Sequence, residues 1–272
     1  MNSPYGKIVL VTGASSGIGA ATARLLAENG YTVYGACRRE MTDVTTQNGE
    51  IRYVKMDVTD DASVKNAVSA IVAQAGEIDV VVNCAGNGIA GALEDCTVAE
   101  AEYQFSANYF GVIRVLNSVL PVMRSQKRGL VVNIGSIAGL YAIPFQSLYS
   151  SSKFAIEALT EALRMELYPF GVKASVVEPG DTKTGFTGAR KFCAASAGSA
   201  YEETMRRSVA KMEHDEQNGV SPVAVAKCVL LTMQKKNPPV RTVVGFSYRC
   251  LVFLRRILPA RTINWLLRIL YC

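Results

Sequence analysis

The sequence predicts an α/β fold with a single doubly wound parallel sheet of seven strands and helices on both faces. Three observations predict this fold class. Short runs rich in Val and Ile alternate with amphipathic helical stretches, which is the pattern of repeated βαβ units. A glycine-rich turn directly follows the first of these runs. The chain has 272 residues, of which 49% are hydrophobic, so it is long enough to bury one sizeable core.

The strands are expected where β-branched residues cluster, and the helices where apolar residues recur with a period of about 3.6. The predicted strands span residues 7–12, 32–37, 52–57, 78–83, 129–134, 172–177 and 240–245, and the predicted helices lie near 17–29, 60–75, 98–126, 147–168 and 221–235. Right-handed crossovers would bring the carboxyl ends of the strands to one edge of the sheet, where ligands bind in folds of this kind. Functional residues are therefore expected directly after the strands.

One long segment interrupts the alternation of strands and helices. Residues 181–220 separate the sixth strand from the last predicted helix and contain only a short predicted helix near 201–213. A connection of this length is typical of a lid or a binding loop, so we expect a substrate lid. Residues 1–248 would then form one catalytic domain that includes the lid, and residues 249–272 a basic amphipathic extension of that domain.

Much of the net charge of +6 is local to the C-terminal segment. Residues 249–272 contain no acid and carry Arg249, Arg255, Arg256, Arg261 and Arg268. A basic tail is not a basic groove, so nucleic acid is not an expected partner. The tail has Pro259 midway and no run of about eighteen apolar residues, so it is not expected to span a bilayer. It could lie on anionic lipid, cover the mouth of a pocket or contact a second subunit, and the sequence leaves these alternatives open.

Cysteine and histidine usage argues against a metal site. The cysteines are scattered and form no C-x-x-C pair: Cys37, Cys84, Cys96, Cys193, Cys228, Cys250 and Cys272. His214 is the only histidine, so we expect no metal and read the cysteines as reduced, mostly buried thiols. A Ser/His/Asp hydrolase would have to use His214, which lies in the polar stretch "KMEHDEQ", so a hydrolase is set aside. The first predicted strand begins at residue 7, so we expect no leader and a cytoplasmic location, peripheral to a membrane if the tail binds lipid.

The turn after the first strand has the composition of a dinucleotide site. Gly13, Gly17 and Gly19 follow the spacing G-x-x-x-G-x-G at the start of a helix. Glycine permits a tight turn and a close approach of backbone to a pyrophosphate at the positive end of that helix. Arg38 and Arg39 follow the second strand where an acid would favour NAD(H), so the sequence favours NADP(H). Two solvated surface arginines would give the same pattern.

Further cofactor contacts are expected from the glycine-rich turn and from the ends of the third and fourth strands: Ser15, Ser16, Ile18, Asp57, Val58, Asn83, Ala85 and Gly86. Asp57 and Val58 would read the adenine edge. The small residues of the fourth strand end would let the backbone pass beside a ribose. For each of these residues alone, an ordinary strand-end turn is the simpler explanation.

Tyr149 and Lys153 stand four positions apart on a predicted helix, so both side chains reach the same crevice, where Ser136 ends the fifth strand. A free tyrosine has a pKa of about 10. We expect the lysine ammonium and the positive nicotinamide ring together to lower the pKa of Tyr149, and a lowering by about two corresponds to roughly 2.7 kcal/mol. Tyr149 would then exchange a proton with a substrate oxygen that Ser136 also hydrogen-bonds.

These residues occur in ordered motifs that together resemble those of the short-chain dehydrogenase/reductases. The motifs are "TGASSGIG", "NCAG", "SANYFG", "GSIAG", Y-S-S-S-K and "PGDTKT", and they cover the chain from about residue 7 to 185. Cys84 replaces the Asn that is common in the family's N-N-A-G motif, and Glu178 before Pro179 is unusual. Neither departure removes a catalytic group. The resemblance implies a Rossmann-type dinucleotide-binding fold.

The resemblance also implies roles for individual residues. The catalytic set would be Asn108, Ser136, Tyr149 and Lys153, and the loop residues Pro179, Gly180, Thr182 and Thr184 would contact the nicotinamide end of the cofactor. Tyr149 would donate or accept the proton, and Lys153 would also bind the nicotinamide ribose. Asn108 would hold a water that links Lys153 to solvent, and Thr184 would fix the ring face.

The implied function is NADP(H)-dependent hydride transfer between a hydrophobic ketone and a secondary alcohol of steroid, retinoid or lipid-like character. Apolar side chains of the lid and of the segment before Tyr149 would line the pocket, although ordinary packing explains them equally well: Ile143, Pro144, Phe145, Phe186, Phe192, Tyr201 and Met205. The alternatives are an NADP(H)-binding sensor and a membrane-associated scaffold, both without turnover. The expected partners are a hydrophobic small molecule and further copies of the chain in a homo-oligomer.

Overall fold

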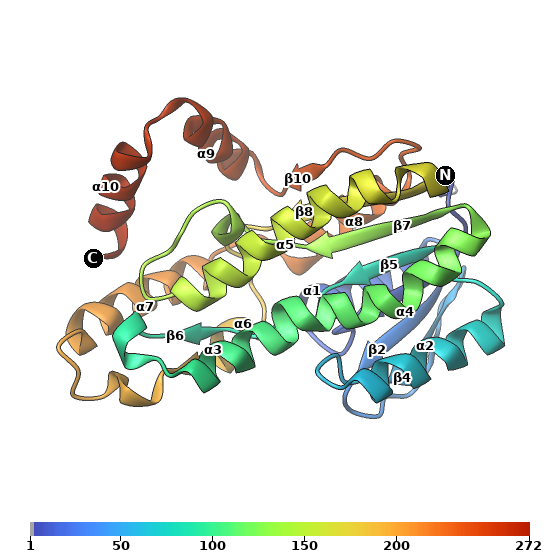
Figure 1. Ribbon diagram of the computed structural model, residues 1–272, viewed down its shortest axis with the longest axis horizontal. Coiled ribbons are helices and arrows are strands. Elements are labelled where there is room, and N and C mark those ends of the chain that lie inside the picture. The colour runs from blue at the N-terminus through green and yellow to red at the C-terminus, as the bar shows by residue number, and fades with distance from the viewer. Residues whose placement is uncertain (1–2) are drawn as a thin grey trace.

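The computed structural model describes residues 3–272 and contains one large sheet of eight strands in the order β10-β8-β7-β5-β1-β2-β4-β3 (Figure 1). The parallel strands are β1 (Ile8–Thr12), β2 (Thr32–Cys37), β4 (Glu50–Lys55), β5 (Val80–Asn83), β7 (Gly129–Ile134), β8 (Val172–Glu178) and β10 (Arg241–Val243). They correspond to the predicted strands and confirm the doubly wound fold class. The eighth strand, β3 (Val44–Thr45), pairs antiparallel with β4 at the edge and was not predicted, since two residues give no periodicity.

Helices cover both faces of the sheet and bury its apolar side chains. One face packs against α2 (Asp61–Ala75), α4 (Gly111–Gln126) and α5 (Ser147–Glu166), and the other against α1 (Gly17–Glu28) and α8 (Pro222–Met233). Strands β5 and β7 are buried along their whole length. Because a strand buried on both faces is apolar throughout, these strands read in the sequence as continuous runs of Val, Ile and Leu.

The helix predicted over 98–126 is interrupted. It consists of α3 (Val98–Phe105), one π-helical turn over Ser106–Phe110 and then α4. Thr97 and Glu100 form a capping box that starts α3. A π turn inside an α-helix is frequently found at a functional site, and this one contains Asn108.

The lid segment has more structure than the single short helix predicted for it. It contains α6 (Phe186–Ala189), the two-residue strand β9 (Lys191–Phe192) and α7 (Glu202–Gln217). Strand β9 pairs in parallel with β6 (Ile89–Ala90) and so ties the lid to the loop after β5. Short 3-10 turns lie at Leu93–Asp95, Ile137–Gly139, Tyr168–Phe170 and Ala194–Ser196.

The prediction of reduced, mostly buried cysteines is wrong in part. Cys96 and Cys193 form a disulfide with their Cα atoms 5.0 Å apart, which joins the loop before α3 to the lid. The two residues are 97 positions apart in sequence, so spacing could not reveal the pairing. The remaining cysteines are free, and two of them, Cys250 and Cys272, are exposed.

The C-terminal segment forms two helices, α9 (Phe246–Ile257) and α10 (Ala260–Tyr271), which meet at an angle beside Pro259 (Figure 1). Ile263 and Tyr248 pack with Ile137 and Tyr141 in a small apolar cluster. The Tyr141 hydroxyl also donates to the Leu251 carbonyl at 2.5 Å. Over residues 3–272, no helix has both the length and the apolar character that crossing a membrane requires.

Candidate active site

The glycine-rich turn between β1 and α1 has the backbone geometry that requires glycine. Gly13 and Gly17 adopt φ values of 67° and 54°, in the left-handed region. A Cβ on Gly19 would collide with the Gly13 carbonyl oxygen, so only glycine lets α1 begin this close to the turn. The side chain of Ser16, the first residue before α1, makes no capping hydrogen bond to the helix amides. These amides form a cradle suited to an anionic group.

The end of β5 packs directly against this turn. The Thr12 hydroxyl accepts hydrogen bonds from the Cys84 and Ala85 amides at 3.0 and 3.1 Å. A Cβ on Gly13 would lie 3.0 Å from the Ala85 Cα, and one on Gly86 would lie 3.1 Å from Asn108 Oδ1. The predicted residues Ala85 and Gly86 therefore lie at the crevice.

Asn83, another predicted cofactor residue, points into the sheet. Its side chain is buried and donates to Asn133 Oδ1 at 2.8 Å, and Asn133 in turn donates to Thr160 Oγ1 at 2.8 Å. This chain of hydrogen bonds connects β5, β7 and α5. The Asn83 side-chain amide nitrogen is therefore committed to the core of the sheet, and its Oδ1 is buried without a partner within residues 3–272.

Both predicted phosphate-binding arginines are exposed at the end of β2, beside the turn. Arg39 Nη2 donates to the Ser15 carbonyl at 2.8 Å and so lies over the glycine-rich turn. Asp57 Oδ1 accepts from the Thr59 amide and hydroxyl at 2.9 and 2.7 Å. Burial alone would raise the pKa of Asp57, but the Thr59 hydrogen bonds and then the charges of Arg38 and Arg114 hold it below its ordinary value.

The loop after β8 folds back over the same turn. A Cβ on Gly17 would lie 3.5 Å from the Thr184 Cβ, so Thr184 and the glycine-rich turn face each other. The Thr182 hydroxyl donates to the Gly180 carbonyl at 2.9 Å, and the Pro179 carbonyl accepts from the Ile137 amide at 2.9 Å. The structure thus brings the residues predicted for the two ends of the cofactor to one crevice.

Tyr149, Lys153 and Ser136 converge at the carboxyl end of β7. Lys153 Nζ lies 5.8 Å from the centre of the Tyr149 ring and donates to the Ile134 carbonyl at 2.8 Å. Ser136 Oγ accepts from the Ala138 amide at 3.1 Å, which orients its hydroxyl. The Lys153 side chain is almost fully buried. An acid, a cation and an orienting hydroxyl therefore share one partly desolvated site.

The protonation states differ from the sequence-based expectation. Burial raises the pKa of Tyr149 to about 12; Ser136 and Arg190 act to lower it, and Glu216 acts to raise it. Burial lowers the pKa of Lys153 to about 8, against the opposing effects of Cys84 and Glu157. The expected lowering of the pKa of Tyr149 by Lys153 is therefore not found in the protein alone, because the cost of desolvating a phenolate is larger. At neutral pH Tyr149 is a protonated phenol, the form that donates a proton.

Asn108 is buried in the π turn, and both polar atoms of its side chain are hydrogen-bonded to protein groups. Its Oδ1 accepts from the Asn87 amide at 2.8 Å, and its Nδ2 donates to the Asn87 carbonyl and to Ser152 Oγ at 3.0 and 3.1 Å. The Ser152 hydroxyl in turn donates to the Tyr149 carbonyl at 2.7 Å. Asn108 thus connects the loop after β5 to the helix of Tyr149, and any link to a water would have to use its main chain.

The lid places one predicted apolar residue beside Tyr149. The Phe186 ring lies 5.6 Å from the Tyr149 ring, centre to centre, whereas Phe192 and Tyr201 are exposed. Met205 is buried and packs against Phe145. The predicted apolar lining is therefore only partly at the crevice.

Sequence reasoning missed two charged residues of the lid. Arg190 follows α6, and Glu216 lies near the end of α7; the two form an ion pair whose charges act on Tyr149. Neither residue belongs to a motif, and 26 positions separate them. Only the folded lid brings them together.

The unusual Glu178 has a structural explanation. It is fully buried at the end of β8, where Arg241 Nε lies 3.4 Å from Glu178 Oε1 and 2.8 Å from Glu157 Oε2. Burial, together with the charge of Glu157, raises the pKa of Glu178 to about 8. One arginine thus connects β10 to both β8 and α5.

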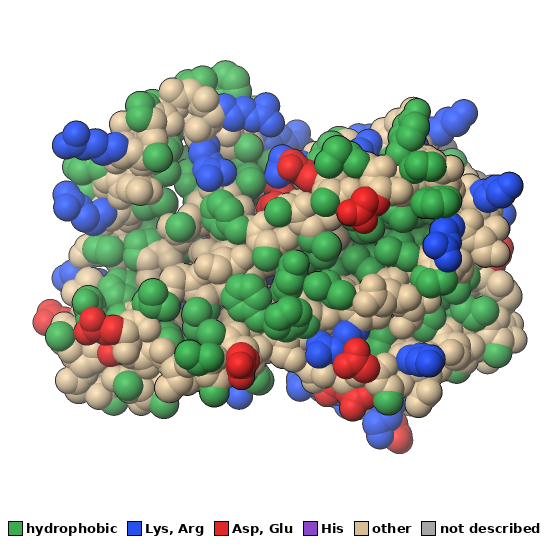
Figure 2. Space-filling view, viewed as in Figure 1, with side chains coloured by type: hydrophobic (Ala, Val, Ile, Leu, Met, Phe, Trp, Pro, Cys, Tyr) green, Lys and Arg blue, Asp and Glu red, His purple; other side chains and the backbone are tan. Residues whose placement is uncertain are grey.

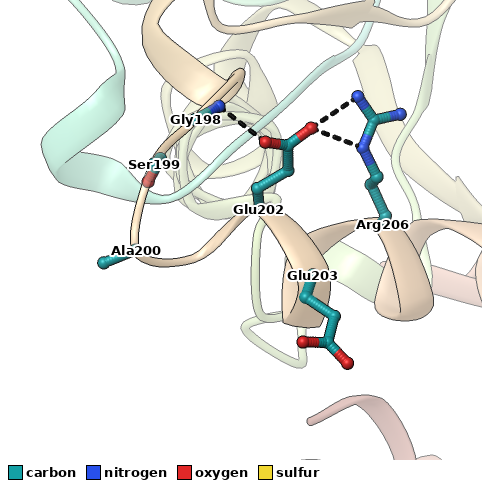
Figure 3. A pocket seen from close by; sticks show the side chains of 6 residues that line it. All are labelled: Gly198, Ser199, Ala200, Glu202, Glu203 and Arg206. Atoms are coloured by element: carbon teal, nitrogen blue, oxygen red, sulfur yellow. Dashed lines mark hydrogen bonds and ion pairs between the residues drawn. The ribbon is translucent and has the colours of Figure 1, made fainter.

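A shallow hollow at the start of α7 is not this site (Figure 3). It is lined by Gly198–Ala200, Glu202, Glu203 and Arg206. The Glu202 carboxylate already accepts from the Gly198 amide at 2.6 Å and pairs with Arg206 at 2.7 Å. None of the predicted catalytic residues lines it.

Comparison with known proteins agrees with this geometry. The family model described as short chain dehydrogenase matches residues 7–191. The chain is 40% identical to the 3-ketodihydrosphingosine reductase of Bacteroides thetaiotaomicron over 97% of its own length and 98% of that protein. The chain therefore belongs to the short-chain dehydrogenase/reductase family, and it is an oxidoreductase.

Solved structures share the fold. A short-chain dehydrogenase/reductase from Burkholderia phymatum in complex with NAD covers 94% of both chains with a TM-score of 0.78 and 22% identity, which shows the fold alone. An alcohol dehydrogenase from Thermococcus sibiricus complexed with 5-hydroxy-NADP covers 89% of this chain and 97% of its own, with a TM-score of 0.70 and 27% identity.

Proposed function

We propose that this protein reduces a long-chain lipid-like ketone to the secondary alcohol with NADPH, and that its substrate is an amino ketone of the 3-ketodihydrosphingosine type. The observation that carries the proposal is the convergence of Tyr149, Ser136 and Lys153 beside the glycine-rich cradle. The near full-length similarity to a 3-ketodihydrosphingosine reductase supports the substrate class. Steroid and retinoid ketones, expected equally from the sequence, become secondary candidates.

The site residues fit a dinucleotide. The left-handed glycines and the uncapped start of α1 suit a pyrophosphate. Thr184, which faces Gly17, and Lys153, which lies near Tyr149, are the residues that we propose for the nicotinamide half. When bound, NADPH would supply the hydride that adds to the carbonyl carbon. The cofactor would thereby become NADP⁺.

The chain's own groups handle the proton and the developing charge. The neutral phenol of Tyr149 gives its proton to the carbonyl oxygen, so that the C=O group becomes CH–OH. The Ser136 hydroxyl hydrogen-bonds the same oxygen, where negative charge develops. Lys153, fixed by the Ile134 carbonyl, stabilises the phenolate that remains.

Replacing the proton donor tests this assignment. Tyr149→Phe should lower kcat for 3-ketodihydrosphingosine by roughly a hundred- to ten-thousandfold, the range for a general acid. NADPH oxidation, followed by absorbance, measures the rate. Tyr168→Phe removes an exposed hydroxyl far from any predicted motif and should leave the rate unchanged. A Tyr149→Phe variant with the parental rate would show that another group donates the proton.

A sensor without turnover remains the alternative function. It would need the glycine-rich cradle but not Tyr149. Wild-type protein that binds NADPH yet oxidises none of a broad panel of lipid, steroid and retinoid ketones would favour it.

The preference for NADP(H) rests on the chain's own residues. Arg38 and Arg39 are exposed at the end of β2, and Arg39 is bonded across the glycine-rich turn. A guanidinium can bind a 2′-phosphate in fork geometry, whereas an acid in this place would repel it.

Reversing the charge at Arg38 should weaken the preference for NADPH over NADH. Arg38→Asp should weaken NADPH binding by roughly ten- to a hundredfold, the equivalent of one lost charge-assisted contact, and affect NADH much less. Arg24→Asp makes the same charge change on α1 and serves as the control. Fluorescence titration with both reduced cofactors measures the two dissociation constants. Equal losses for NADPH and NADH would place the phosphate-binding group elsewhere.

The outer face of the C-terminal helices supports a peripheral contact with anionic lipid, which we also propose. Hydrophobic residues including Phe253, Trp265 and Ile269 are exposed there beside arginines. In Figure 2 the surface formed by α9 and α10 shows hydrophobic side chains (green) and basic side chains (blue) but no acidic ones (red). The inner face of the tail packs on Tyr141 and Ile137, and we propose that the tail thereby covers one side of the site. The two interpretations of the tail are compatible.

Vesicle sedimentation tests the lipid contact. Wild-type protein should sediment with vesicles containing phosphatidylserine and less with pure phosphatidylcholine, since each arginine near an anionic surface contributes about 1 kcal/mol. The double variant Phe253→Ser/Trp265→Ser should sediment less, whereas Lys65→Gln on α2 should not change it. Equal sedimentation of all three proteins would exclude the tail as the lipid-binding segment.

A second copy of the chain is the partner we propose for the face formed by α4 and α5. Hydrophobic side chains gather over these helices in Figure 2, and Phe110, Met165 and Tyr168 are exposed. Exposed apolar patches of this kind are typical of interfaces.

Size-exclusion chromatography with light scattering should give a mass of at least a dimer for wild-type protein. Phe110→Ser should lower that mass, because it removes an exposed apolar side chain from the proposed interface. A wild-type monomer at high concentration would contradict the proposal.

A further inference from the structure

Arg190 is a buried cation with donors that no protein group uses. Its side chain is 1% exposed, and within residues 3–272 neither Nε nor Nη1 has a hydrogen-bond partner. A guanidinium has five N–H donors, and leaving buried donors without acceptors is costly. An arginine in this state is expected to serve a ligand that brings acceptor oxygens.

Arg190 and the proton donor Tyr149 pack against the same aromatic ring, Phe186. The guanidinium carbon lies 5.8 Å from the centre of the Phe186 ring, and the Phe186 ring lies 5.6 Å from the Tyr149 ring. The charges of Arg190 and Glu216 both act on the Tyr149 phenol, in opposite directions. A substrate whose carbonyl meets Tyr149 and Ser136 would therefore have its neighbouring carbon atoms near Arg190.

The carboxylates around Arg190 define what kind of group fits. Glu216 pairs with Nη2 and also accepts from Thr187 Oγ1 at 2.6 Å, and Glu213 Oε1 lies 3.7 Å from Nη1. Two carboxylates and one guanidinium leave an excess of negative charge. An anionic group is therefore disfavoured, whereas a hydroxyl can accept from Arg190 and an ammonium is attracted by the carboxylates.

We infer that Arg190 and Glu216 form the binding site for the polar head of the substrate, an amino alcohol attached next to the reacting carbonyl. A substrate hydroxyl accepts from Arg190 Nε and Nη1, and the substrate ammonium lies on the side of Glu216. Phe186 is the aromatic neighbour that Arg190 and Tyr149 share. The inference rests on the proposed function and adds to it a recognition site on the lid.

Specificity measurements test the inference. The substrates are 3-ketodihydrosphingosine, its N-acetyl derivative, which lacks the ammonium, and a long-chain alkan-3-one that lacks both polar groups. For Arg190→Met, the ratio of kcat/KM for the amino ketone to kcat/KM for the plain ketone should fall roughly ten- to a hundredfold, mainly through KM. For Glu216→Gln, the preference for the amino ketone over its N-acetyl derivative should fall by a similar factor.

The matched controls come from α7, the helix that carries Glu216. Arg206 and Glu202 form an exposed ion pair on α7, visible in Figure 3, so Arg206→Met and Glu202→Gln make the same chemical changes away from the crevice. Both should keep all substrate ratios within about twofold of wild type. Arg190→Lys keeps the positive charge but loses the planar, forked guanidinium. If its lid remains folded, this variant should retain part of the preference for the amino ketone over the plain ketone that Arg190→Met loses.

The outcomes separate the two proposals. If wild-type protein reduces none of the three ketones, the proposed function fails. If it reduces the amino ketone but Arg190→Met lowers kcat/KM for all three substrates by one factor, Arg190 merely holds α6 to α7 and the inference is overturned. Thermal melting of each variant shows whether a uniform loss comes from unfolding of the lid.

Discussion

Burial of a phenol and an ammonium in one crevice is the constraint on which the site depends. Desolvation favours the neutral form of each group, and it raises the pKa of Tyr149 to about 12 and lowers that of Lys153 to about 8. Lys153 is kept in place by the Ile134 carbonyl, and Ser136 by the Ala138 amide. The protein alone therefore holds the proton on the phenol, and the proton leaves only when the reaction itself creates a charge that needs it.

The parallel sheet makes this arrangement possible. Strands β5 and β7 are buried along their length, and a chain of hydrogen bonds through Asn83, Asn133 and Thr160 ties them to α5, which carries Tyr149 and Lys153. The carboxyl ends of these strands cannot shift without breaking buried hydrogen bonds. The glycine-rich turn, the strand ends and the helix of Tyr149 are thus fixed relative to one another by the core rather than by the loops.

Local signals explain what the sequence could predict. Strands buried on both faces read as short runs rich in Val and Ile, and the positive φ of Gly13 and Gly17 leaves a glycine pattern. The features that were missed depend on contacts between distant segments: the pairing of Cys96 with Cys193, the ion pair of Arg190 with Glu216, and the inward orientation of Asn83. In the protein without cofactor, burial raises the pKa of Tyr149 rather than lowering it, since spacing on a helix reveals a neighbouring charge but not the depth of burial.

The lid, the loop after β8 and the tail share contacts, so none of them can move far alone. Tyr248 of α9 lies against Gly180, and its hydroxyl accepts from the Asp181 amide at 3.0 Å and donates to the Asp181 carboxylate at 2.5 Å. At the other end of the tail, Arg207 of α7 donates to the Cys272 carbonyl at 2.7 Å. The proposed long-chain substrate would have to pass the cover that the tail is proposed to form. Because the exposed side of the cover carries the apolar and basic residues proposed to meet lipid, membrane contact and opening of the site would involve the same two helices.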